Sequence, residues 1–260
     1  LTEKNLCFTF DDGNRSQYDV ALPILEDFKI KSFFFVYSSL FGEKPDLLEI
    51  YRYFRINYFS NVDEFYDLFF KESNKNLLKF FEDNEKTIRN IKLKYPFYSI
   101  NDVKFRLVRN VLLSRKNYQE IMLKMFKEKN FEPKDYYEIL FMNNKHLVRM
   151  RKLGHLIGLH SHTHPTLLEK LSFEEQSIEY SKNITILSKI LGCNKNEIKF
   201  MSHPCGSYNQ DTLQILKNLG IELGFKPIMT IESEKNMKKI NNSLLEIARQ
   251  DHAVIIKMMN

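Results

Sequence analysis

Three histidines lie within five positions of one another, in the stretch HSHTHP at residues 160–165. His160 and His164 are four residues apart. On a helical turn this spacing would place both imidazoles on one face, where a single metal ion can bind them. His162 is two residues from each and would point elsewhere. The spacing therefore predicts a metal-binding pair, with solvent-facing or core histidines in a turn as the alternative.

A metal that keeps an open position for water needs a third protein ligand, and two histidines with one carboxylate are typical of catalytic zinc sites. The stretch TFDDG at residues 9–13 supplies Asp11 and Asp12. Adjacent aspartates diverge, so one can bind the metal while the other acts as a base beside it. Alone, D-D-G indicates a turn; its weight comes from its combination with H-x-x-x-H.

A third polar loop has the sequence SHPCGSYN, at residues 202–209. Pro204 and Gly206 shape this loop. Exposed backbone N–H groups in such a loop can stabilise a developing oxyanion. On its own, however, a P-x-G loop indicates only a turn.

Each of these stretches follows a short apolar run that is typical of a buried strand. We expect strands at 5–10, 31–39, 155–161, 198–204 and 221–227, and helices at 17–28, 145–154, 172–192 and 209–220. Pro23 should disturb the first helix, and Ser172 and Glu175 have capping-box spacing. A strand–helix–strand rhythm predicts a parallel α/β fold, which gathers its site at the carboxyl edge of the sheet.

Residues 45–145 interrupt this rhythm. The segment contains no glycine and is rich in Tyr, Phe, Lys and Glu, with apolar residues three to four positions apart. This spacing predicts several amphipathic helices inserted into a single catalytic domain that spans residues 1–260. The pattern does not distinguish a packing or lid role from partner binding.

Composition limits the function classes. The net charge is +6, but the basic residues are scattered, which argues against nucleic acid as a partner. Cys7, Cys193 and Cys205 show no C-x-x-C spacing, so we expect no disulfide framework and a reducing compartment. No apolar run is long enough for a transmembrane helix. We therefore expect a cytoplasmic, or membrane-associated, protein; an extracytoplasmic location stays open because the chain begins without Met and an upstream segment could have been trimmed.

The ordered set TFDDG, H-S-x-x-H-P and P-x-G resembles the NodB-type polysaccharide deacetylases, carbohydrate esterase family 4, in the branch with a P-Y-G third motif. The resemblance covers about residues 5–40 and 145–228. It implies a distorted (β/α) barrel of about seven strands, an α/β fold, with the helical segment as an insertion.

The resemblance also implies roles. Asp11 matches the family's catalytic base, and Asp12, His160 and His164 match its metal triad. The backbone N–H of Cys205 matches its oxyanion donor. Pro204, Gly206 and Tyr208 are the expected substrate-binding residues of the third loop. The implied cofactor is one divalent metal, foremost Zn²⁺, with Co²⁺, Ni²⁺ or Mn²⁺ as alternatives.

The chain departs from the family pattern in two places. Ser202 stands where the family often has the arginine that orients the base, and Arg249 is the candidate replacement. The family's acid histidine, in a late Leu-x-Leu-His strand, has no clear match. His252 is the only histidine in the C-terminal segment, and His203 and His162 are local alternatives.

The resulting hypothesis is a metal-dependent hydrolase that removes N-acetyl, or less often O-acetyl, groups from a saccharide in surface polysaccharide, O-antigen or capsule assembly. Its substrate could be lipid-linked or nucleotide-linked. A metal amidohydrolase acting on a small C–N substrate is one alternative. A catalytically inactive saccharide-binding relative is the other, because of the missing arginine and acid. The oligomeric state is not indicated.

Overall fold

The computed structural model describes residues 6–42, 47–73, 76–227, 243–252 and 255–256. The chain divides into two compact units. The catalytic-motif unit combines residues 1–46 and 138–260, and the helical unit spans Leu47–Tyr137. All three stretches identified above lie in the catalytic-motif unit. That the helical unit is an insertion within one catalytic domain stays a prediction.

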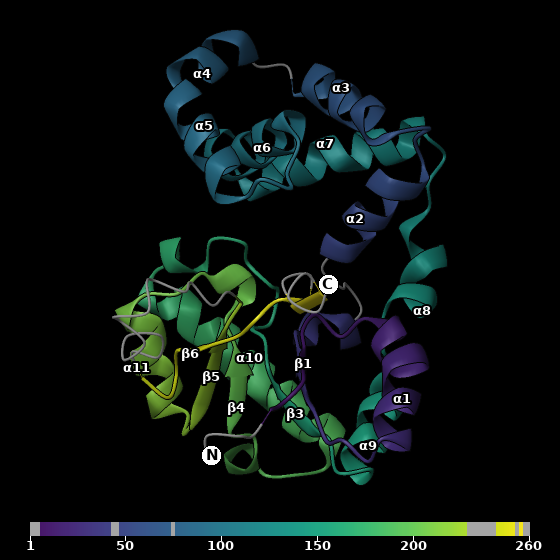
Figure 1. The fold of residues 1–260 in the computed structure, drawn as a ribbon, viewed down its shortest axis with the longest axis vertical. Coiled ribbons are helices and arrows are strands. Elements are labelled where there is room, and N and C mark those ends of the chain that lie inside the picture. Colours follow the sequence, from purple (N-terminus) through teal and green to yellow (C-terminus); the bar gives the residue numbers. More distant parts are fainter. Residues whose placement is uncertain (1–5, 43–46, 74–75, 228–242, 253–254, 257–260) are drawn as a thin grey trace. The chain divides into compact units, whose positions relative to one another are not determined.

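The catalytic-motif unit is built on a six-stranded parallel sheet whose strands follow chain order (Figure 1). The strands are β1 (Thr9–Phe10), β2 (Phe33–Val36), β3 (Leu156–Leu159), β4 (Phe200–Ser202), β5 (Leu223–Lys226) and β6 (Ile247–Ala248). Because all six run in one direction, the residues that follow them meet at one edge. The predicted α/β fold is confirmed, with six strands in the described ranges.

Helices connect the strands at the predicted places: η1 (Gln17–Ala21) continued by α1 (Leu22–Asp27), α9 (Asn144–Lys152), α10 (Phe173–Leu191) and α11 (Gln210–Asn218). Pro23 lies at the start of α1, directly after the widened π-helical turn of η1, because proline cannot donate the backbone hydrogen bond that an uninterrupted helix requires. The capping box between Ser172 and Glu175 is present, and Gly192 ends α10 with a left-handed φ of 63°.

Alternating strand residues build two cores. Phe34, Val36 and Ile157 belong to the cluster packed against the connecting helices. The intervening residues turn to the opposite face, where the ring of Phe33 lies 5.3 Å from that of Phe225. These rings come from β2 and β5, which are separated by two strands, so the sheet is strongly curled and its concave face is filled by aromatic rings.

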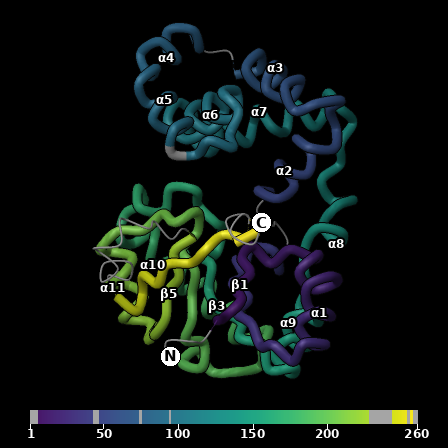
Figure 2. Tube along the Cα trace, viewed as in Figure 1, coloured from purple at the N-terminus to yellow at the C-terminus, as the bar shows by residue number. Residues whose placement is uncertain are grey.

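The helical unit consists of α2 (Leu48–Asn57), α3 (Val62–Glu72), α4 (Leu77–Asp83), α5 (Glu85–Lys94), α6 (Ile100–Leu107), η3 (Val108–Leu112), α7 (Arg115–Glu128) and η4 (Pro133–Tyr136), followed by α8 (Tyr137–Leu140) (Figures 1 and 2). Its core is aromatic: Phe54, Phe65, Phe69 and Phe126 are buried. The carboxylate of Asp102 accepts hydrogen bonds from three side chains, those of Arg55, Tyr66 and Arg106. With 18 basic and 13 acidic residues, this unit has a net charge of +5, out of +6 for the whole chain.

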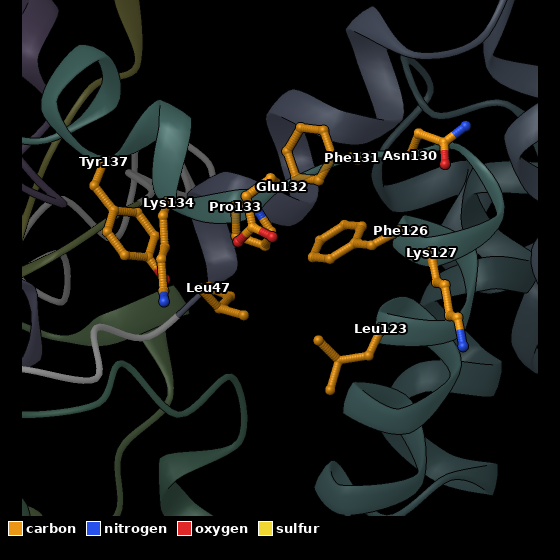
Figure 3. A pocket seen from close by; sticks show the side chains of 10 residues that line it. All are labelled: Leu47, Leu123, Phe126, Lys127, Asn130, Phe131, Glu132, Pro133, Lys134 and Tyr137. Atoms are coloured by element: carbon orange, nitrogen blue, oxygen red, sulfur yellow. The ribbon is translucent and has the colours of Figure 1, made fainter.

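A groove lies on the helical unit between α7 and the segment that follows it (Figure 3). Leu123 and Phe126 line it from α7, and Pro133 and Tyr137 line it from the following segment. Lysines stand at its margin beside these apolar side chains. No helix in the described ranges combines the length and hydropathy that crossing a bilayer requires.

Gly158 is required by the curl of the sheet. A Cβ at this position would lie 2.6 Å from the carbonyl oxygen of Phe200 and 2.7 Å from the ring of Phe35. We therefore expect Gly158→Ala to lower the free energy of unfolding by about 1–3 kcal/mol through overpacking. Urea denaturation measures this loss. Gly42→Ala is the control, because the nearest atom to its Cβ lies 3.5 Å away; equal stability of the two variants would contradict the prediction.

Candidate active site

The carboxyl edge of the sheet brings together residues that are up to 238 positions apart in the chain. Asp11 and Asp12 follow β1, and His160 follows β3. Ser202 ends β4, and Arg249 follows β6. The sequence placed Asp11, Asp12, His160 and Ser202 at strand ends. The structure adds that the side chain of Ser202 contacts Asp11.

Asp12, His160 and His164 form a cluster whose ligand atoms all lie within 4.8 Å of one another. Oδ1 of Asp12 is 3.2 Å from Nε2 of His160 and 3.1 Å from Nε2 of His164. The two Nε2 atoms are 3.2 Å apart. Both imidazoles are almost completely buried. The three atoms expected to bind a metal therefore converge on one point.

The hydrogen bonding of His160 fixes which nitrogen faces the cluster. Its Nδ1 donates to the carbonyl oxygen of Ser202 at 2.8 Å. In the neutral imidazole, Nε2 then carries the lone pair, as a metal ligand requires. Two imidazole nitrogens and a carboxylate oxygen suit zinc and related divalent metals, and separations of 3.1–3.2 Å approach the roughly 3.4 Å expected between tetrahedral ligands at about 2.1 Å. The cluster therefore fits such an ion.

The electrostatics of the cluster agree with this interpretation. Burial raises the pKa of Asp12, but hydrogen bonds from His160 and His164 outweigh it and hold the pKa well below its ordinary value. Burial lowers the pKa of His160, but the charges of Asp11 and Asp12 outweigh it, so its pKa is raised. The carboxylate of Asp12 therefore favours a positive partner at this point, and a bound metal ion would supply that charge.

Left-handed backbone conformations mark the three strand-end loops. Asp12 has a φ of 76°, Ser161 of 62°, His164 of 50° and Cys205 of 52°. Residues other than glycine rarely adopt such values, and they persist where the surrounding contacts impose them. The helical turn considered for the spacing of His160 and His164 is absent, and that prediction was wrong. The histidines converge through a loop that turns with two left-handed residues.

Asp11 makes a bidentate ion pair with Arg249. Nη1 and Nη2 of the arginine lie 2.8 and 2.6 Å from the two carboxylate oxygens. Oγ of Ser202 donates to Oδ2 of Asp11 at 3.1 Å and accepts from Nη2 of Arg249 at 2.9 Å. Nε of Arg249 donates to the carbonyl of Lys226, which fixes the guanidinium on β5. The arginine thus holds the carboxylate of Asp11, and that it orients a catalytic base stays a prediction.

The positive groups around Asp11 keep its carboxylate ionised. Burial raises its pKa, but the positive His160 and the hydrogen bonds and charge of Arg249 outweigh burial, and the pKa is lowered. An ionised carboxylate beside a metal cluster can accept a proton, which is the property required of a base.

The three histidines considered as the acid lie in different environments. Nδ1 of His162 is 2.9 Å from Oγ of Ser38, and His162 is not one of the three residues of the cluster. His252 lies at the surface, with 85% of its side chain exposed and Asp251 beside it. His203 is buried, and its Nε2 donates to the carbonyl of Leu245 at 2.8 Å. Within the described ranges, none of these contacts connects one of the three histidines to Asp12, His160 or His164.

The third loop is held to the segment before β6. The ring of Tyr208 stacks on His203 at 4.2 Å, and its hydroxyl donates to Glu246 at 2.9 Å. Pro204 is buried, while Cys205 is exposed at the turn. Gly206 has a φ of 70°, and a Cβ there would lie 2.8 Å from Pro227. The loop therefore presents the backbone of Cys205 at a fixed turn.

Sequence reasoning missed two residues of α10 that contact the histidine loop, Glu179 and Asn183. Oδ1 of Asn183 accepts from the backbone N–H of His160 at 2.9 Å, and its Nδ2 donates to the carbonyl of Val36. A signal was present: these two polar residues are four positions apart beside Tyr180, Ile184 and Leu187, which are buried. Polar residues beside the apolar stripe of a helix need partners when they are buried.

A family model described as polysaccharide deacetylase matches residues 1–100 and 122–224. A search of curated proteins finds no match. Among solved structures, a de-N-acetylase from Aggregatibacter actinomycetemcomitans is 13% identical, with a TM-score of 0.50, covering 99% of this chain and 76% of its own.

Two further solved structures are similar. The deacetylase PplD of Streptococcus pyogenes, in complex with acetate, is 19% identical, with a TM-score of 0.49 and coverage of 96% of this chain. IcaB from Ammonifex degensii is 14% identical, with a TM-score of 0.48 and coverage of 94%. The chain spans 66% of the length of each of these two chains.

Because His203 is buried, we expect the free energy of unfolding to fall in acid. Burial, reinforced by the positive His160 and Arg249, lowers its pKa to about 4, although Leu245 and Glu246 act in the opposite direction. In the unfolded chain the pKa of this histidine is about 6.5, so as the pH falls the unfolded state binds the proton before the folded state does. The stabilisation is therefore complete above about pH 6.5 and is lost as the pH falls through about 4.

Protonation of His203 should lower the free energy of unfolding of the metal-free protein by about 2 kcal/mol when the pH falls from 7 to 5. Urea denaturation of wild type and His203→Gln at both pH values isolates the contribution, because glutamine does not titrate. The wild type should lose more stability than the variant. The exposed His252, changed to Gln, should leave the pH dependence as it is in wild type; equal slopes for wild type and His203→Gln would refute the prediction.

Proposed function

Because the chain belongs to the polysaccharide deacetylase family, we propose that it is a metal-dependent hydrolase that removes N-acetyl groups from a saccharide. The observation that carries this proposal is the convergence of Asp12, His160 and His164 beside an ionised Asp11. Hydrolysis breaks the C–N bond of the amide. The acyl carbon gains the oxygen of water, and the nitrogen leaves as an amine after gaining a proton.

The metal would be held by Asp12, His160 and His164, and zinc is the ion that we expect. When bound, such an ion polarises the acetyl carbonyl and makes water more acidic. The chain supplies the ligand orientation. The carbonyl of Ser202 holds the ring of His160, and the backbone N–H of His164 donates to Oγ of Ser161 at 3.0 Å.

Asp11 would act as the base that takes the proton of the attacking water. Arg249 and Ser202 fix the carboxylate in place and leave it ionised. The absence of an arginine at position 202 was one of the two reasons to consider an inactive relative, the other being the missing acid. Because Arg249 supplies a guanidinium to the same carboxylate, the charge required at this point is present, and this supports the enzyme hypothesis.

The third loop would serve the acetyl group. The backbone N–H of Cys205 would be the oxyanion donor, and Pro204, Gly206 and Tyr208 would border the substrate; the turn at Cys205 and the bond from Tyr208 to Glu246 support this proposal. Proton donation to the leaving amine requires a separate acid. His203 is a poor candidate, because its pKa of about 4 leaves it neutral at pH 7 and its Nε2 proton is bonded to Leu245.

The substrate would be an N-acetylated sugar of a surface polysaccharide, O-antigen or capsule, in a lipid-linked or nucleotide-linked form. The net charge of +6 is compatible with an anionic linkage. Acetate release should be compared among N-acetylated oligosaccharides, nucleotide-linked N-acetyl sugars and lipid-linked N-acetyl sugars. Release from none of them by the metal-loaded protein would refute the proposed activity.

Metal content tests the site before any substrate is known. We expect about one zinc ion per chain after exposure to zinc and gel filtration, because three converging ligands bind one ion. Elemental analysis should show this ion lost from Asp12→Ala and His160→Ala. Asp27→Ala, an exposed aspartate at the end of α1, is the matched control and should retain the metal. A metal-free wild type would contradict the proposal.

The Asp11→Asn variant separates the base from the metal ligands. Asparagine keeps the size of the side chain and an oxygen for Arg249 but does not accept the water's proton. We expect zinc content to equal that of wild type, while the rate of acetate release falls by about 10²–10⁴-fold. Asp27→Asn should have wild-type activity. Retained turnover in Asp11→Asn would remove this residue from the role of base.

A further inference from the structure

The carboxylate of Glu179 binds the loop that carries the two histidines. Its Oε2 accepts from the backbone N–H of His162 at 2.8 Å and of Thr163 at 2.7 Å. Its Oε1 accepts from the hydroxyl of Thr163 at 2.7 Å. Both oxygens are thus engaged, in three short hydrogen bonds to an ionised acceptor, a strong class of hydrogen bond.

Asn183 stands one helical turn further along α10 and binds the same loop at the backbone N–H of His160. Residues four apart on a helix share a face, so α10 presents both acceptors side by side. The backbone N–H groups of residues 160, 162, 163 and 164 all donate to side chains. The loop therefore depends on side-chain contacts where a helix would use its own carbonyls.

This dependence matters because the loop is in an unfavourable conformation. Ser161 and His164 both have left-handed φ values, each of which costs of the order of 1–3 kcal/mol in a residue other than glycine. The two backbone hydrogen bonds that Glu179 accepts hold His162 and Thr163, which lie between Ser161 and His164. If they were lost, the loop could relax, and the Nε2 atoms of His160 and His164 would separate.

We propose that Glu179 is a positioning residue for the metal site, which it serves through the geometry of its hydrogen bonds and not through its charge. The inference rests on the proposed function, because it presumes that Asp12, His160 and His164 bind a metal. No contact of Glu179 with the cluster is involved; it acts on the backbone between the two histidines.

Two substitutions separate geometry from charge. Glu179→Gln removes the charge but keeps the length: its amide oxygen can accept from both N–H groups, and its NH₂ can donate to the hydroxyl of Thr163. Glu179→Asp keeps the charge but is one methylene shorter and does not reach all three donors. The proposal predicts that the glutamine variant binds zinc within about threefold of wild type, whereas the aspartate variant binds about 10–100-fold more weakly.

Zinc affinity should be measured by competition with a chromogenic chelator on metal-free protein, which requires no substrate. Glu174→Asp, an exposed acid in the first turn of α10, is the matched control and should bind zinc like wild type. Circular dichroism of each metal-free variant verifies that it is folded. Thr163→Val, which removes one of the three bonds, should weaken zinc binding less than Glu179→Asp does.

The outcomes distinguish the two proposals. If wild type binds no zinc, the proposed function fails. If wild type binds zinc and both Glu179 variants bind it equally well, the positioning role is overturned. If the glutamine variant is weak and the aspartate variant is normal, the charge of Glu179 matters instead of its geometry, which also overturns the inference. If Glu179→Asp does not fold, the other two variants carry the test. Weak zinc binding by Glu179→Gln would refute the positioning role. Unchanged zinc affinity of Thr163→Val would refute it as well.

Discussion

The site depends on one constraint: three atoms that carry lone pairs must be held about 3 Å apart in a buried place. Oδ1 of Asp12 and the Nε2 atoms of His160 and His164 repel one another unless a proton or a cation lies between them. Such an arrangement does not form spontaneously in a flexible chain. The surrounding structure must impose it, and most of the contacts at the carboxyl edge of the sheet can be understood as doing so.

Three elements share this work. The carbonyl of Ser202, at the end of β4, fixes the ring of His160. Helix α10 binds the loop from outside, through Asn183 and Glu179. The segment that follows β2 binds the same loop: the backbone N–H of Ser38 donates to the carbonyl of Ser161. Because β2, β4 and α10 are packed into one core, a shift of any of them would disturb the cluster.

The sequence predicted the fold and the convergence of Asp12, His160 and His164 because both depend on local patterns. Strand–helix alternation, the capping box at Ser172 and the glycine at 192 determine elements, and each was found where the pattern placed it. The conformation of the histidine loop could not be predicted from spacing, since an interval of four residues fits a helical turn as well as a left-handed loop. The choice is made by Glu179 and Asn183, which lie at least fifteen residues further along the chain.

Arg249 shows that the guanidinium beside Asp11 can come from a different strand than the family pattern suggests. The arginine expected at the end of β4 is absent, and a guanidinium from the end of β6 reaches Asp11 instead. This is possible because the sheet is curled: Nη1 of Arg249 also donates to Oγ1 of Thr9 on β1, at the opposite end of the strand order. Ser202, in place of the arginine, is small enough to admit the guanidinium and bonds both partners. The positive charge beside Asp11 is therefore fixed in space, and the strand that supplies it can differ when the sheet brings its two edge strands together.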